Sequence, residues 1–514
     1  MRKILATMIL SAAILSLGML GSSAVFAEEY EDTVYIGAEI SSLDSADPYG
    51  TTGMESQVFT NMTHMLLTYN NTDTGELEGI TAESWKDLNG DGVDWQITLK
   101  KGVHFHTGEE MTAEDVQFTW EYCHPDAGNV VKPISAAAYV DSYEIVDDYN
   151  IIFHLKSGMY DFPTYLDTKI YSKKAFDTME PEAAALVGNG PYMWDESLQQ
   201  VGVQYGATRF DDYFEGTDNY PTKHLVFKCI PDGDAIVASL QAGEIDALLC
   251  LQSAPYYITL ESDPNINVLS RDGAQSFYMG WNWTSELVKD VKFRTAIAKA
   301  INKDDIIAVA FENGVGASPS YNFCPPTGLG YAEVNAIQYD PEGAKALLEE
   351  IGVAEGTKLT LIHYASMKKV AEVIQANLAE IGIDCAITQM DASNWTAIKS
   401  SKEGYDIFLD YCSYKGALLY NYNRFFQENG SSNMVGYYSE EFEQLLNNVL
   451  SASSYEGMLE EFATMQQFVA DDVSVIPLAY GRIMGAALKD VEGYSLADTT
   501  NWMNHSKLCI PKRG

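Results

Sequence analysis

The sequence predicts an α/β protein of two or three domains. Segments with helical periodicity alternate along the chain with short segments in which apolar and polar residues alternate, an order typical of helices layered on sheets. The chain has 514 residues, more than the roughly 250–300 at which a single hydrophobic core stops growing. Hydrophobic residues make up 46% and aromatic residues 12% of the chain, which is enough for several packed cores.

The first residues have the layout of a cleaved secretory signal peptide, at 1–27. A positive start precedes an apolar run over residues 4–20, and Val25 and Ala27 stand where small residues precede a cleavage site. A transmembrane anchor is the alternative, although the run is at the short edge of what spans a bilayer. We expect an extracytoplasmic protein, in a periplasm or cell envelope or secreted. The first cysteine is Cys123, so no lipoprotein acylation site is expected.

Charge and cysteine content exclude some classes of partner. The formal net charge of −41 argues against nucleic acid and anionic membrane surfaces as partners. The seven cysteines are scattered without a C-x-x-C pair, so a structural zinc site is not expected. No cofactor is predicted.

The most regular early segment begins at Trp95. Residues 95–99 alternate as a half-buried strand does, and residues 103–106 are expected to be the hairpin partner of this strand. Thr112 with Asp115 three residues later is close to a capping box, which predicts a helix whose buried face includes Trp120.

Further along, two helices alternate with strands. Asp340-Pro341 supplies an N-cap and a proline at the first helical position, and Gly352 ends the apolar stripe that follows. A second stripe over residues 370–381 ends at Gly382. This order predicts a βαβ-type domain.

Five motifs occur in the order found in one known family. Residues 95–122 read WQITLKKGVHFHTGEEMTAEDVQFTWEY; the others are Gly188-Asn189-Gly190-Pro191-Tyr192, Leu240-Gln241-Ala242-Gly243-Glu244-Ile245-Asp246, the helix at 290–306, and Tyr339-Asp340-Pro341 with Ala379-Glu380-Ile381-Gly382-Ile383. The sequence thereby resembles the oligopeptide- and dipeptide-binding proteins of ABC importers, of the family 5 type.

The resemblance implies a two-lobed periplasmic-binding-protein fold with an extra domain and with the ligand cleft between the lobes. By analogy, domain I comprises 28–69, 186–275 and 488–514. Domain II, the extra domain, is 70–185, and domain III is 276–487. A cleft between two lobes can close over a solute and exclude water.

The resemblance also implies function. A solute-binding component captures a short peptide or similar organic solute and delivers it to ABC permease and ATPase subunits, as a monomer and without catalysis. No G-x-S-x-G, H-E-x-x-H or Walker loop occurs. A secreted hydrolase that uses two carboxylates stays open as an alternative, as does a secreted sensor or peptide chaperone without a transporter.

Two segments imitate metal sites. Residues 87–92 copy the start of an EF-hand loop, but position twelve is Thr98 and not Glu, so a hairpin turn is the better interpretation. His104 and His106 share a strand face, but His106 belongs to the family motif and a structural role is favoured. No metal site is predicted.

The predicted ligand contacts combine aromatic, amide and basic side chains. Two tryptophans that flank an asparagine at the expected second hinge crossing could stack on a sugar or a peptide side chain, with a core pair as the alternative. Peptide binders have, at the position of Tyr414, an Asp that pairs with the peptide amino terminus. Here Lys415 stands beside it, with Asp410 several residues away, so an oligosaccharide or glycoside remains an alternative ligand. The predicted residues are Trp281, Asn282, Trp283, Trp395, Tyr411, Cys412, Tyr414, Lys415, Tyr422, Arg424 and Trp502.

Overall fold

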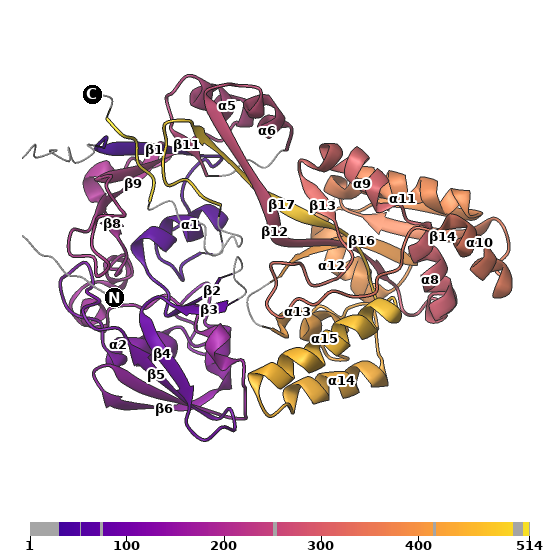
Figure 1. The fold of residues 1–514 in the computed structure, drawn as a ribbon, viewed down its shortest axis with the longest axis horizontal. Coiled ribbons are helices and arrows are strands. Elements are labelled where there is room, and N and C mark those ends of the chain that lie inside the picture. Colours follow the sequence, from indigo (N-terminus) through magenta and orange to yellow (C-terminus); the bar gives the residue numbers. More distant parts are fainter. Residues whose placement is uncertain are drawn as a thin grey trace, which may run out of the picture.

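The chain forms two lobes joined by long strands (Figure 1). The computed structural model describes residues 30–51, 53–71, 76–249, 254–414, 418–496 and 507–512. The predicted signal peptide, Lys415 and Trp502 lie outside these ranges. Within them, no helix is long and apolar enough to cross a membrane.

One mixed sheet runs through both lobes, with the strand order β15-β14-β16-β12-β17-β11-β1-β10-β9-β8. In the first lobe, β1 pairs in parallel with β10 and β11, and apolar residues of β1 and α1 form one core with β8, β9 and β10. These elements are β1 (Thr33–Ala38), α1 (Met54–Thr63), β8 (Tyr192–Trp194), η3 (Glu196–Leu198), β9 (Gln204–Arg209), β10 (His224–Cys229), α5 (Gly233–Gln241), β11 (Ala247–Leu248) and α6 (Ala254–Glu261).

A separate sheet of order β4-β5-β7-β6 and its covering helices lie below this part of the first lobe (Figure 1). Trp95, Trp120 and Phe153 meet in its core. The predicted helix after Thr112 is confirmed, because the Asp115 carboxylate accepts from the Thr112 backbone N–H at 2.8 Å. The elements are β2 (Thr68–Asn71), β3 (Glu76–Gly79), β4 (Ala82–Asp87), β5 (Asp94–Leu99), α2 (Ala113–Tyr122), η1 (Ser135–Tyr139), β6 (Val140–Asp147), β7 (Asn150–Leu155), η2 (Phe162–Tyr165), α3 (Lys173–Thr178) and α4 (Pro181–Ala184).

The hairpin expected at 95–106 is wrong, because β5 pairs with β4 and β7 instead. Residues 103–105 instead pair with residues 109–111 across a short turn, through an isolated bridge between His104 and Glu110. The loop at 87–92 is the predicted hairpin turn: it joins β4 to β5, and the Asp87 carboxylate accepts from the backbone N–H groups of residues 89, 90 and 92.

The second lobe contains the predicted βαβ unit, since β14 and β15 are parallel and α11 connects them. Asp340 caps α10 and accepts from the Gly343 N–H at 2.9 Å. The elements are α7 (Glu286–Lys289), α8 (Val291–Ala300), α9 (Lys303–Ala310), η4 (Glu312–Gly314), β13 (Ala317–Pro319), α10 (Pro341–Glu350), β14 (Thr357–His363), η5 (Ala365–Met367), α11 (Lys368–Glu380), β15 (Ile383–Gln389), α12 (Ala392–Ser401), β16 (Ile407–Ser413), α13 (Tyr420–Phe426), α14 (Glu440–Leu450) and α15 (Tyr455–Asp471).

Two long antiparallel strands, β12 (Ile266–Trp281) and β17 (Ile476–Leu488), cross from one lobe to the other (Figure 1). One end of this pair joins β11 in the first lobe, and the other end joins β16 in the second. The register between the two strands shifts between Asp272 and Ser276. A bulge bends and twists a strand locally, so the crossing is where one lobe can change direction relative to the other.

Close packing of the turn at 188–190 explains why residues 188 and 190 are glycines. A Cβ on Gly188 would lie 1.9 Å from the Thr63 carbonyl oxygen, and one on Gly190 would lie 2.3 Å from that of Met62. Between them, the Asn189 side chain accepts from the Met65 N–H at 2.8 Å. The turn is therefore pressed against the end of α1.

The large buried cores draw on different parts of the chain. One core gathers residues 34–65 and 192–249 with Ala487, Val491 and Leu508, and a second gathers Tyr49 with residues 67–187. Two more are built from residues 278–478. The exact domain boundaries remain a prediction.

Candidate functional site

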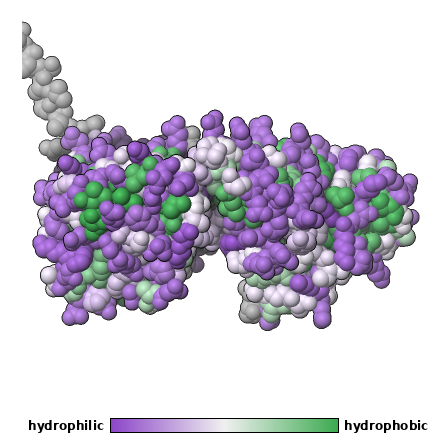
Figure 2. All heavy atoms as spheres, turned by 90° about the horizontal axis from the view of Figure 1, so that it is seen from below, coloured by the Kyte–Doolittle hydropathy of each residue, from purple (hydrophilic) through white to green (hydrophobic). Residues whose placement is uncertain are grey.

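A cavity of about 350 Å³ lies where the two lobes face each other. Its volume falls in the range of roughly 300–1,000 Å³ that is usual for small-ligand pockets. Seen from below, a deep indentation separates the lobes (Figure 2). The residues that give the cavity its polarity are Tyr49, Gln57, Tyr69, Lys132, Tyr139, Tyr165, Asp167 and Lys169 from the first lobe, and Tyr414, Tyr420, Asn423 and Arg424 from the second.

Two lysines on the first-lobe wall converge on one glutamine. Lys132 Nζ donates to Gln57 Oε1 at 2.8 Å, and Lys169 Nζ donates to the Gln57 carbonyl oxygen at 3.4 Å. Lys169 also donates to Thr60 Oγ1 at 2.6 Å. Gln57 and Thr60 lie one turn apart on α1, so this helix holds both ammonium groups against the cavity.

The backbone of Lys169 is fixed on both sides. It forms an isolated bridge with Leu66, and its carbonyl oxygen accepts from the Tyr49 hydroxyl at 2.8 Å. Lys169 is only 5% exposed. Burial, and then the charge of Lys132, lower the pKa of Lys169 well below its usual range.

Helix α13 forms the second-lobe wall. Tyr420, Asn423 and Arg424 are spaced three and four residues apart, which places them on one helix face, and all three line the cavity. The Arg424 guanidinium donates to Ser432 Oγ at 2.9 Å and to the Tyr420 hydroxyl at 3.3 Å. It also lies 5.1 Å from the Tyr420 ring centre, within cation–π range.

Asn423 lines the cavity and has one buried polar atom without a partner. Its side-chain Oδ1 is buried and has no hydrogen-bond partner among the residues that the structure describes. An unsatisfied buried polar atom costs roughly 1–3 kcal/mol.

A buried acid lies behind the first-lobe wall of the cavity. Asp161, 3% exposed, precedes η2, whose Tyr165 lines the cavity. Burial raises the pKa of Asp161 to about 6, although a hydrogen bond with the Tyr165 side chain opposes the rise. No cation forms an ion pair with Asp161 within the described ranges.

Two of the predicted ligand contacts line the cavity and one lies behind it. Tyr414 and Arg424 contribute directly. Tyr422 is fully buried, and its ring packs against Phe462 with a centroid separation of 4.9 Å. Lys415 and Trp502 lie outside the described residues, so their predicted roles remain predictions.

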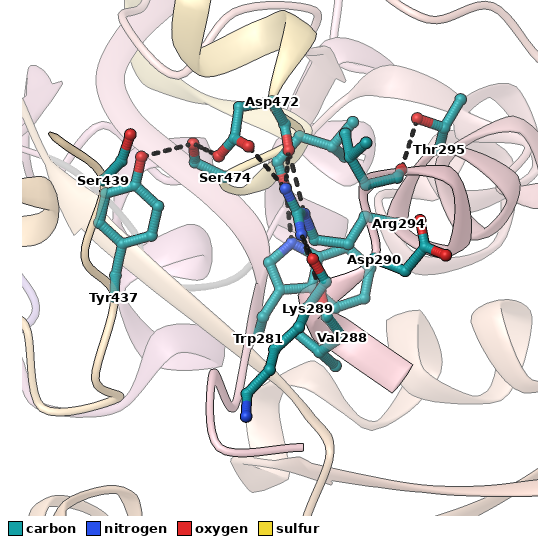
Figure 3. Close-up of polar contacts among 12 residues, drawn as sticks. Trp281, Val288, Lys289, Asp290, Arg294, Thr295, Tyr437, Ser439, Asp472 and Ser474 are labelled. Atoms are coloured by element: carbon teal, nitrogen blue, oxygen red, sulfur yellow. Dashed lines mark hydrogen bonds and ion pairs between the residues drawn. The ribbon is translucent and has the colours of Figure 1, made fainter. Parts of the chain in front are cut away.

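The Trp281–Trp283 segment packs into a core of the second lobe, where Trp281 lies beside Arg294 (Figure 3). Trp281 is fully buried and donates from Nε1 to the Val473 carbonyl oxygen at 2.7 Å. Asn282 donates to the carbonyl oxygens of residues 402 and 405. The Trp283 ring stacks under the Arg294 guanidinium at 4.5 Å and packs on Tyr437. The two rings therefore have partners within the chain, and ligand stacking by them remains a prediction.

Three other predicted residues gather around Asp410 in the second lobe. Asp410 accepts from Trp395 Nε1 at 3.1 Å and from Lys399 Nζ at 2.7 Å. The next strand residue, Tyr411, is 45% exposed, whereas Cys412 is buried. Asp410 is thus already paired with an ammonium group of its own chain.

Sequence reasoning missed the first-lobe wall altogether. No motif contains Tyr49, Gln57, Lys132 or Lys169, and these residues meet through contacts between segments that are far apart in the sequence. One signal was available: Lys169 stands in a run, 168–172, that is otherwise free of charge. A lone lysine in such a run is unusual, because lysine is seldom buried.

Comparison with known proteins agrees with this geometry. The sequence profile of the bacterial extracellular solute-binding proteins, family 5 (middle region), matches residues 76–433. The oligopeptide-binding protein AppA of Bacillus subtilis is 27% identical over 481 residues, which cover 84% of this chain and 83% of that protein.

Solved structures share the fold. The unliganded open form of the murein tripeptide-binding protein MppA has a TM-score of 0.80, at 16% identity and with 94% of this chain and 98% of that chain covered. Helicobacter pylori DppA in complex with the peptide STSA has a TM-score of 0.70, at 26% identity, covering 94% and 99%. These matches confirm the predicted two-lobed fold, and the chain belongs to the bacterial extracellular solute-binding proteins of family 5.

Proposed function

We propose that this protein is the solute-binding component of an ABC importer and that it captures a short peptide between its lobes. The observation that carries the proposal is the cavity shared by both lobes, with cationic, tyrosine and asparagine side chains among its lining residues. A peptide offers the matching groups: amide N–H donors, carbonyl acceptors and a carboxylate.

Closure of the lobes supplies the signal for delivery. A ligand that contacts both walls binds the closed arrangement more tightly than the open one, so it shifts the population towards closure. The bulged crossing of β12 and β17 provides the place where that movement occurs. The membrane permease then contacts the closed form of the protein, which is populated mainly when the solute is bound.

The export route and the partners belong to the same proposal. A cleaved signal peptide at 1–27 would deliver the chain outside the cytoplasm, where it would act as a monomer. Binding without turnover, with permease and ATPase subunits as partners, follows from the family's role in solute capture.

The test is identification of the bound solute. The chain without residues 1–27 is purified natively and denatured, and the released small molecules are analysed by mass spectrometry. Peptide masses are expected. Saccharide masses would replace the peptide with the carbohydrate alternative, and loss of intact peptides with appearance of their fragments on incubation would indicate a hydrolase.

A further inference from the structure

The cavity between the lobes has a charge opposite to that of the chain. The protein has 32 Lys and Arg against 73 Asp and Glu. Among the cavity-lining residues the balance reverses: Lys132, Lys169 and Arg424 face it with a single carboxylate, that of Asp167. Clefts lined by one sign of charge focus the electric field and concentrate solutes of the other sign.

Two of these cations bind only neutral groups. Among the described residues, Lys169 donates to the Gln57 carbonyl and the Thr60 hydroxyl, and Arg424 donates to the hydroxyls of Ser432 and Tyr420. Among described residues, no carboxylate lies within ion-pair distance of either cation. Burying a charge without an opposite charge beside it is costly, so an anion that enters the cavity would be attracted to both groups.

Two other buried cations of the chain are paired differently. Lys399 is as buried as Lys169 and has Asp410 at 2.7 Å, and the buried Arg294 has Asp472 at 2.6 Å. At these two positions the chain itself supplies the carboxylate. At the cavity, a solute that enters between the lobes can supply it.

We infer that Lys169 on the first lobe and Arg424 on the second form an anion subsite that requires a carboxylate on the bound solute. Lys132 adds positive charge beside Lys169. Since the two cations belong to different lobes, one carboxylate held between them links the lobes and favours their closure. The inference rests on the proposed peptide function and specifies which peptides bind.

The carboxylate can be the C-terminus of a peptide or an acidic side chain. To separate the two sources, an equimolar mixture of unmodified tripeptides and the same mixture with amidated C-termini are incubated with the full mature chain. The retained masses are read by native mass spectrometry. We expect retention of the unmodified mixture, and retention from the amidated mixture only of members with Asp or Glu.

Affinities of a retained peptide for variants test the residues. Lys169→Met and Arg424→Met should each weaken binding by about tenfold or more, and should reduce the preference for free over amidated peptide. Lys303→Met is the matched control. Lys303 is 9% exposed and donates only to the Ser320 carbonyl oxygen, but it lies within the second lobe away from the cavity. Its replacement should leave the affinity unchanged.

The outcomes separate the two claims. Equal retention of amidated peptides without acidic residues would overturn the anion subsite and leave peptide capture in place, as would unchanged affinity of folded Lys169→Met and Arg424→Met proteins. If the protein retains no peptide from either mixture, both the peptide function and the anion subsite are overturned. Circular dichroism of each variant establishes that it is folded.

Discussion

Lys169 and Lys399 are both nearly inaccessible to solvent, but their surroundings differ in one respect. Lys399 Nζ lies 2.7 Å from the Asp410 carboxylate, which Trp395 also contacts. Lys169 Nζ meets a carbonyl and a hydroxyl oxygen, next to a second lysine and the cavity. One lysine completes a network inside a lobe, and the other faces the space where a ligand binds.

This difference teaches how a buried charge can be interpreted. A paired buried charge gives little information about ligands, because the chain has already compensated it and breaking the pair mainly unfolds the protein. An unpaired one lowers stability in the free protein, and that cost is removed when a ligand supplies the opposite charge. Replacing Lys169 with an uncharged residue should therefore raise the stability of the free protein and lower its ligand affinity. Replacing a residue at most core positions should lower both.

The largest expected effect is at the paired site. Asp410→Asn keeps the shape but leaves Lys399 buried without a counter-charge, so the free energy of unfolding should fall by about 3–5 kcal/mol. Urea denaturation measures it. The double variant Asp410→Asn with Lys399→Met should recover part of the loss, and Glu350→Gln, which breaks the exposed pair with Lys292, should cost less than about 1 kcal/mol. A similar small loss for Asp410→Asn would contradict the comparison.

Asp161 is a buried acid, as Lys169 is a buried base, and it should make the stability of the fold depend on pH. Its pKa is raised to about 6 in the folded protein. Asp161 stabilises the fold while protonated, and this contribution is lost as pH rises from about 4 through about 6. Asp161→Asn should therefore match the parent near pH 4 and exceed its unfolding free energy by about 3 kcal/mol above about pH 7. Parallel pH profiles for the two proteins would refute this.

Lys169→Met should raise the stability of the unliganded protein. The methyl-sulfur side chain fills similar space without a charge to desolvate, so the gain should be about 1–3 kcal/mol. Lys399→Met, which strands the Asp410 carboxylate, should have the opposite sign. Thermal unfolding with and without a bound peptide measures both. A destabilised Lys169→Met protein would mean that Lys169 is structural.

The smallest effect is expected at Trp281, where the predicted ligand contact is tested directly. Trp281→Phe removes the hydrogen bond to the Val473 carbonyl oxygen, and should cost about 1–2 kcal/mol of stability without changing peptide affinity. Isothermal titration calorimetry with a retained peptide decides. Loss of affinity at unchanged stability would instead establish Trp281 as a ligand contact.

Local signals in the sequence predicted several elements well. The cap at Thr112, the Asp340-Pro341 start of α10 and the glycine ends at Gly352 and Gly382 act within a few residues, so sequence alone suffices for them. The prediction of a hairpin at 95–106 was wrong because it also used local signals alone. Such signals do not reveal that β5 pairs with β4 and β7 instead.

The sequence by itself determined the family, the alternation of helices and strands, and the aromatic and basic character of the 411–424 region. Only the tertiary structure decided which of those residues face the cavity, because Tyr414 and Arg424 line it while Tyr422 and Trp281 turn into the core. It also decided the charge of the site. Lys169 is separated by more than 250 residues from Arg424, and a cation's need for a partner depends on the groups that folding brings around it.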